Sequence, residues 1–463
     1  MKANRFHKKT IFRRALLVML VMTTGLGLLS GCAVQPDATP TPTPSETKTP
    51  TGEGSATPTS TPMATPTASA GPSDASPSAS AGGSDDPLPA PSDFETYQSN
   101  VITPTGNNGV LTSKEAVTES FRGVFRVQET GKFNYKLYFS NNVDSTWGDG
   151  SENYRNMPTK PYKIISAFLG YANDMRGTGT IQGKQAVTFD GATERLVEAG
   201  EMLWSDAVPV EVPEGKFLIF EWTVEYTLIP CTRTNGTGVA LKRKPFGTVM
   251  TFLRENDVPL PDRIACDRGC ATRVAFIGDS ITMGEGTTAG MDAYWAAQIA
   301  KGLGSSVSCW NLGLGYARAN DAVNSPAWLE KAKNNDVVVL CFGVNDINSG
   351  AYKVGSRTAD QIAADIAYIA DVCRKGGARV ILFSTPPYTY ASTTKPKWAP
   401  LVEKIKALAE KEGYDFFDFA ACLGKESDPS VPAYGGHPND KGCAVVAERF
   451  LASGLIPITT EEP

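Results

Sequence analysis

The sequence VAFIGDSI at residues 274–281 turns from an apolar run to a glycine followed by two polar side chains. Similar apolar runs recur toward the C-terminus, at 307–312, 337–341, 380–383 and 416–419. The segments between them have helical periodicity, most clearly after residue 358, where Thr358 and Gln361 form a capping box and a Gly-Gly pair ends the pattern. Strands that alternate with helices predict an α/β domain over residues 271–457, with a doubly wound parallel sheet of five strands.

The preceding region, residues 94–265, has a different pattern. Short runs rich in β-branched and aromatic residues are separated by turn pairs such as Asp190-Gly191 and Glu214-Gly215. They occur at residues 135–139, 186–189 and 217–224. Regularly spaced short strands of this kind predict an all-β sandwich that precedes the α/β domain.

The N-terminus reads as a targeting signal. Residues 1–31 combine basic residues with a short apolar run, and this run ends in Leu29-Ser30-Gly31-Cys32. The ending resembles the bacterial lipobox, which implies lipidation of Cys32 and a lipid-anchored protein on the extracytoplasmic face of a bacterial cell membrane. Residues 32–93 are rich in Pro, Thr, Ser and Ala, so we expect a disordered tether that reaches on the order of 180 Å.

Charge and histidine content exclude several classes of protein. The chain has 463 residues and a net charge of −5, which argues against a nucleic-acid partner. Its two histidines are His7 and His437, and only His437 lies outside the N-terminal segment, so a multi-histidine metal site is excluded. We expect neither a metal nor another cofactor.

Polar residues follow the predicted strands at their carboxyl ends, where parallel sheets carry their sites. Ser280 follows the first strand, a glycine-rich loop at 313–316 the second, and Asn345 the third. His437 stands in a Gly/Pro loop before the last helix. Each motif by itself is common: Gly-Asp-Ser is a frequent helix cap, Asn-Asp a frequent turn, and a lone histidine is more often structural.

Taken together and in this order, the motifs resemble the four blocks of the SGNH (GDSL-type) hydrolase superfamily, over residues 273–455. The resemblance implies a flavodoxin-like fold with Ser280 as nucleophile and His437 as general base. It also implies an oxyanion hole built from Asn345 and the backbone N–H groups of Ser280 and Gly315. The loop register is open by one residue, since Tyr316 can occupy the glycine position of the family.

One position departs from the family pattern. The superfamily usually has an aspartate three residues before the histidine, where this chain has Tyr434. Asp428 or a backbone carbonyl could orient the imidazole instead. We favour a Ser-His dyad, which some carbohydrate esterases of the superfamily use.

The upstream region resembles the β-sandwich that precedes SGNH domains in secreted esterases, and it could line the cleft, bind glycan or be structural. The segments that carry this likeness are 137–141, 187–191 and 204–208. The expected function is a serine esterase that acts on acetyl or short-chain acyl esters, with acylated carbohydrate or another small ester as substrate. An acyltransferase that acts on a cell-wall or surface glycan and an inactive glycan-binding lipoprotein are the alternatives. Cysteines add a possible disulfide between Cys266 and Cys270.

Overall fold

The computed structural model describes residues 92–145, 156–234, 238–347, 357–388, 398–423 and 436–457. These residues lie in one compact unit, Asp86–Pro463. Cys32, residues 32–91 of the expected tether, Asp428 and Tyr434 lie outside the described residues, so the expectations placed on them stay predictions. The tether is expected to reach residue 93, but Asp93 already begins the first described helix. No helix of the described part is long and apolar enough to cross a membrane.

The region up to Cys266 is built almost entirely of strands, after one short helix. Its elements are α2 (Asp93–Thr96), β1 (Gln98–Ser99), β2 (Gly109–Phe125), β3 (Gly131–Ser140), β4 (Asn142–Val143), β5 (Met157–Pro158), β6 (Tyr162–Ala172), β7 (Gln182–Val187), β8 (Arg195–Val197), β9 (Met202–Trp204), β10 (Val208–Val212), β11 (Phe217–Arg233), β12 (Val239–Phe246), β13 (Val249–Arg254), β14 (Asp257–Val258) and β15 (Arg263–Cys266). We call this part the β region.

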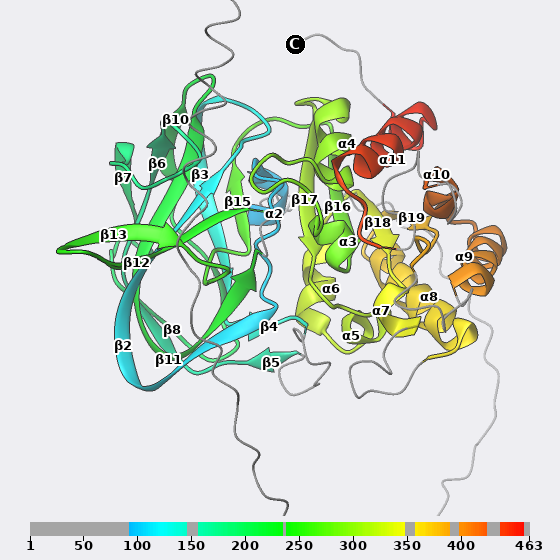
Figure 1. Ribbon diagram of the computed structural model, residues 1–463, viewed down its shortest axis with the longest axis horizontal. Coiled ribbons are helices and arrows are strands. Elements are labelled where there is room, and N and C mark those ends of the chain that lie inside the picture. The colour runs from blue at the N-terminus through cyan, green and yellow to red at the C-terminus, as the bar shows by residue number, and fades with distance from the viewer. Residues whose placement is uncertain are drawn as a thin grey trace, which may run out of the picture. The chain divides into compact units, whose positions relative to one another are not determined.

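Two antiparallel sheets dominate the β region (Figure 1). One runs in the order β1-β15-β3-β10, and the other in the order β13-β12-β2-β11-β6-β7. Alternate residues of facing strands, such as Leu137 and Phe139 on β3 and Phe220 and Trp222 on β11, belong to one hydrophobic cluster. A strand directs successive side chains to opposite faces, so this spacing gives the two sheets a common core.

The elements change at residue 272 to alternating strands and helices. They are β16 (Thr272–Gly278), α3 (Ser280–Met283), α4 (Trp295–Leu303), β17 (Val307–Gly313), α5 (Ala319–Val323), α6 (Pro326–Lys333), β18 (Val337–Cys341), α7 (Val344–Ile347), α8 (Ala359–Lys375), β19 (Arg379–Phe383), α9 (Trp398–Glu412), β20 (Asp415–Phe417), α10 (Phe419–Cys422) and α11 (Asp440–Ala452). The five strands pair in parallel in the order β17-β16-β18-β19-β20. Chain order reverses between β16 and β18, and such a switch point is where sites form in these sheets.

Helices cover both faces of this sheet. Val274 and Phe276 of β16 pack in the cluster that contains α4, α10 and α11. Ala275 and Ile277, the alternate residues, pack in the cluster that contains α5, α6, α8 and α9. Burial on both faces explains why the strands read as continuous apolar runs rather than as alternating patterns.

Local signals located most of these elements, with two corrections. The capping box of Thr358 and Gln361 opens α8. The run expected at 416–419 is a strand only to Phe417, because the Asp418 side chain caps α10 and Phe419 begins that helix. The strand expected at 186–189 ends at Val187.

The eight described cysteines are free thiols, so the disulfide considered between Cys266 and Cys270 is not present in the structure. Cys266 is instead buried in the core of the β region.

The β region closes one edge of the parallel sheet. Strand β17 lies at that edge, where backbone groups would otherwise lack a partner strand. The Gln128 side chain supplies both partners at Cys309: its Nε2 donates to the carbonyl at 2.9 Å and its Oε1 accepts the N–H at 3.0 Å. Trp310 Nε1 also donates to Asp262 O at 3.2 Å. At Cys309 the backbone of the edge strand is therefore bonded by a side chain of the β region rather than by another strand.

Candidate active site

Ser280 stands at the turn between β16 and α3. Asp279 is the cap of this short helix, and its carboxylate accepts the N–H of Ile281 at 2.9 Å. Gly278 allows the turn because a Cβ there would collide with the Cys341 carbonyl and the Thr282 hydroxyl. The turn leaves Ser280 half-buried among buried neighbours, with its hydroxyl at the carboxyl end of the sheet.

His437 lies beside Ser280, although 157 residues separate them in the chain. The distance from Ser280 Oγ to His437 Nε2 is 2.8 Å, within hydrogen-bond range. Gly286 lies against the histidine, and a Cβ at this position would come within 2.8 Å of the His437 Cβ. The two side chains therefore lie within the hydrogen-bond distance that a serine nucleophile and its histidine base require.

The surroundings keep the imidazole neutral. Burial lowers the pKa of His437 to about 4, because the charged form loses hydration. A neutral imidazole can accept a proton at Nε2 at any pH well above that value.

The other nitrogen of the ring contacts a residue that we did not predict. Tyr388 Oη lies 3.2 Å from His437 Nδ1, and the two rings meet edge to face with centroids 5.5 Å apart. Tyr388 follows β19 at the same edge of the sheet as Ser280. A search of every strand end for polar side chains would have included it, but no motif marks it out.

The glycine-rich loop after β17 forms a tight turn. Ala317 N–H donates to Leu314 O at 3.2 Å, which places Gly315 and Tyr316 at the two central positions. Tyr316 has φ +60, a left-handed conformation that favours glycine and is needed at the third position of a type II turn. The position of this turn that favours glycine is therefore the one occupied by Tyr316, and not that of Gly315. Which of the two backbone N–H groups donates to an oxyanion stays a prediction.

Asn345 and Asp346 hold this turn from α7. Asn345 Nδ2 donates to Ala317 O at 3.0 Å, so its amide lies directly beside the turn. Asp346 Oδ2 accepts the N–H of Ala319 at 3.0 Å. Sequence motifs that are far apart in the chain thus meet at one place, where Asp346 ties down the loop.

Two carboxyl groups near the site are fully enclosed. Burial raises the pKa values of Asp279 and Asp346 to about 7. Repulsion from Asp346 adds to the shift at Asp279, and repulsion from Asp321 adds to the shift at Asp346. Each accepts backbone N–H groups and so holds a loop in place. Their environment makes them structural anchors whose charge changes near neutral pH.

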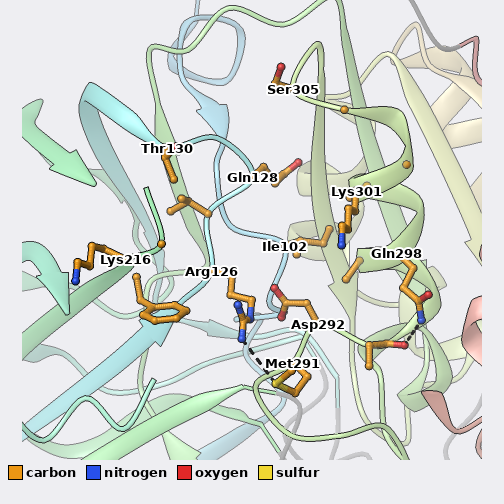
Figure 2. A pocket seen from close by; sticks show the side chains of 18 of the residues that line it. Ile102, Arg126, Gln128, Thr130, Lys216, Met291, Asp292, Gln298, Lys301 and Ser305 are labelled. Carbon is orange, nitrogen blue, oxygen red and sulfur yellow. Dashed lines mark hydrogen bonds between the residues drawn. The ribbon is translucent and has the colours of Figure 1, made fainter. Parts of the chain in front are cut away.

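A separate hollow of about 1090 Å³ lies between the β region and α4. Figure 2 shows Arg126 and Asp292 next to each other among its lining residues, with Lys216 on one side and Lys301 on the other. Neither Ser280 nor His437 lines this hollow. Arg126 Nε also donates to Gly290 O at 3.2 Å, which links the β region to the loop that leads from α3 to α4.

No group of three or more metal-binding side chains occurs among the described residues. What the site offers is a hydroxyl, an imidazole, a phenol, an amide and the backbone of tight turns.

Residues 276–445 match the model of the GDSL-like lipase/acylhydrolase family. A search of curated proteins found no match to this chain.

Solved structures similar to this chain share about two fifths of its length. A carbohydrate acetylesterase from Sinorhizobium meliloti is 20% identical, with a TM-score of 0.33, and the match covers 39% of this chain and 97% of that one. An acetyl xylan esterase is 21% identical, with a TM-score of 0.33, over 39% and 98% of the two chains. The aryl esterase of M. smegmatis is 19% identical, with a TM-score of 0.34, over 40% and 98%.

Proposed function

Since residues 276–445 form a GDSL-like lipase/acylhydrolase domain, we propose that the protein is a serine esterase that removes acetyl or other short acyl groups from carbohydrate. The observation that carries the proposal is the 2.8 Å contact between Ser280 Oγ and His437 Nε2. A neutral histidine base in contact with a serine hydroxyl is the arrangement that acyl transfer through an acyl-enzyme requires. The carbohydrate preference rests on the family resemblance and on the expected wall-spanning tether.

In this mechanism His437 Nε2 takes the Ser280 hydroxyl proton while Oγ bonds the acyl carbon. The electron pair of the carbonyl moves to its oxygen, which is stabilised by the Asn345 amide and by backbone N–H groups of Ser280 and the Gly313–Tyr316 turn. His437 then returns the proton to the departing alcohol. Water attacks the acyl-enzyme with His437 again as base, which releases the acid and restores Ser280.

The test compares Ser280→Ala with the unmodified protein on p-nitrophenyl acetate. Loss of the nucleophile should lower kcat/KM by roughly 10⁴ or more. Ser305→Ala, an exposed serine in the loop before β17, is the matched control and should be unchanged. Equal rates for the Ser280→Ala and unmodified proteins would show that Ser280 is not the nucleophile.

Two further measurements separate the alternatives. Stoichiometric labelling of Ser280 by a fluorophosphonate would rule out an inactive glycan-binding protein, whereas saturable glycan binding without labelling would support one. Product analysis with an acetylated glycan and a glycan acceptor distinguishes hydrolysis, which gives free acetate alone, from transfer to the acceptor.

We also propose that Cys32 carries the lipid that anchors the protein to the cell membrane. Metabolic labelling with a fatty acid should mark the protein, and Cys32→Ala should abolish the label. Equal labelling of both chains would contradict the anchor without affecting the proposed activity.

A further inference from the structure

Each ring nitrogen of His437 contacts a different hydroxyl group. Nε2 lies 2.8 Å from Ser280 Oγ, and Nδ1 lies 3.2 Å from Tyr388 Oη. We propose that Tyr388 is the positioning residue of the catalytic pair, in the place where related sites use a carboxylate: its phenol oxygen accepts the Nδ1–H bond of His437. This inference rests on the proposed esterase function.

The direction of the bond follows from the chemistry at Nε2. To take the proton of Ser280, Nε2 must carry a lone pair, so the proton of the neutral ring must reside on Nδ1. A phenol oxygen next to Nδ1 must then act as acceptor, and it selects the productive tautomer. When Nε2 is protonated during the reaction, Nδ1–H stays on the ring and the bond to Tyr388 persists.

The fold fixes Tyr388 in place. Its side chain is buried in the cluster that contains α4 and α11. The loop that carries it is tied to two neighbouring strands: Ser384 N–H donates to Phe417 O at 3.0 Å, and Thr385 Oγ1 donates to Phe342 O at 2.8 Å. Tyr388 therefore reaches the imidazole from the β19 side, while Ser280 reaches it from the β16 side.

The acid nearest to His437 in the described sequence, Asp440, is bound elsewhere. Its two carboxylate oxygens accept Thr288 N–H at 2.7 Å and Thr288 Oγ1–H at 2.6 Å. A neutral phenol cannot compensate an imidazolium charge as a carboxylate does, and the lowered pKa of His437 agrees with such a neutral partner.

The scarcity of histidine makes a direct test possible. His7→Gln leaves His437 as the only imidazole of the full chain, so ¹⁵N-histidine NMR reports its tautomer and pKa without overlap. We expect the Nδ1–H tautomer to dominate in this protein. A dominant Nε2–H tautomer would overturn the proposal, because Tyr388 would then be the donor.

Tyr388→Phe keeps the ring and removes only the hydroxyl. Without the acceptor both tautomers should become populated, and kcat should fall roughly tenfold with little change in KM, as loss of one neutral hydrogen bond predicts. Tyr162→Phe, at a buried tyrosine of the β region, is the control and should leave both readouts unchanged.

Tyr388→Glu gives a second, gain-of-charge test. A carboxylate at this position should raise the pKa of His437 and move the acidic limb of the kcat/KM profile upward by at least one pH unit. Unchanged tautomer populations and kinetics in Tyr388→Phe would refute the positioning role. The NMR readout does not depend on turnover, so this failure is distinguishable from inactivity of Ser280.

Discussion

Replacement of Lys331 by methionine should destabilise the protein strongly. Lys331 on α6 lies 2.6 Å from Asp144 Oδ2 and also contacts Asp262 Oδ1, and all three side chains are only 1% exposed. Both carboxylates come from the β region, so the cluster joins that region to the parallel sheet. Removal of the ammonium leaves two buried carboxylates without their cation.

The magnitude follows from this burial. Breaking a buried ion pair by removing one partner costs about 3–5 kcal/mol, because the remaining charge stays desolvated. That is a large share of a typical unfolding free energy of about 5–15 kcal/mol. With a denaturant slope of about 3 kcal/mol/M, the urea midpoint should fall by roughly 1–1.7 M.

The defect should also depend on pH. Burial raises the pKa of Asp262 to about 7 despite the lysine, and burial raises the pKa of Asp144 as well. Without the lysine both should rise further. When folding raises the pKa of an aspartate, its contribution to the free energy of unfolding is complete at a pH below the pKa of the unfolded state, about 3.9. That contribution is lost as the pH rises through the pKa of the folded state. The Lys331→Met defect should therefore be largest near pH 8 and smaller at pH 5.

The assay is urea unfolding at pH 5 and pH 8, followed by tryptophan fluorescence. Lys301→Met, at an exposed lysine of α4, is the control and should change stability by no more than about 0.5 kcal/mol. The reasoning would be refuted if Lys331→Met changed the free energy of unfolding by no more than the control does. It would also be refuted if the loss were equal at pH 5 and pH 8.

Three other measurements test the site and the interface. The kcat/KM profile of the unmodified protein should keep its plateau down to about pH 5 and fall with a midpoint near pH 4, set by His437; a midpoint above 6 would contradict its lowered pKa. Asp428→Ala should lower kcat/KM less than tenfold if Tyr388 orients the histidine, whereas a loss of a hundredfold or more would make Asp428 the partner. Arg263→Met should leave the urea midpoint unchanged or raise it, because this buried guanidinium stacks 4.7 Å from the Trp310 ring centroid and has no hydrogen-bond partner among the described residues; a loss above 2 kcal/mol would point to an unseen anion or water.

The meeting of Ser280 and His437 could be predicted from sequence because its signals are local. Ser280 follows an apolar run and a glycine that only a tight turn explains, and His437 is the one histidine beyond the N-terminal segment. The order of strands and helices is equally local, since each apolar run and each cap lies within a few consecutive residues. Because parallel strands point in the same direction, their carboxyl ends lie at the same edge of the sheet, and the motifs that follow these strands lie there too.

The environment of the pair depends on contacts that no local pattern encodes. Tyr388 lies 49 residues from His437, in a segment after β19 that begins with bonds from Ser384 to the end of β20 and from Thr385 to Phe342, the residue after β18. The left-handed conformation of Tyr316 is imposed by the turn between Leu314 and Ala317, although its side chain disfavours that conformation.

The joining of the two regions is likewise a tertiary result. Lys331 meets Asp144 across 187 residues and Asp262 across 69, and Gln128 reaches Cys309 across 181. Sequence fixes local turns, caps and strand polarity because these depend on neighbouring residues. Which buried charge meets which, and which hydroxyl reaches the second nitrogen of His437, is decided only when the packed sheets bring distant loops together, because burial selects the partner.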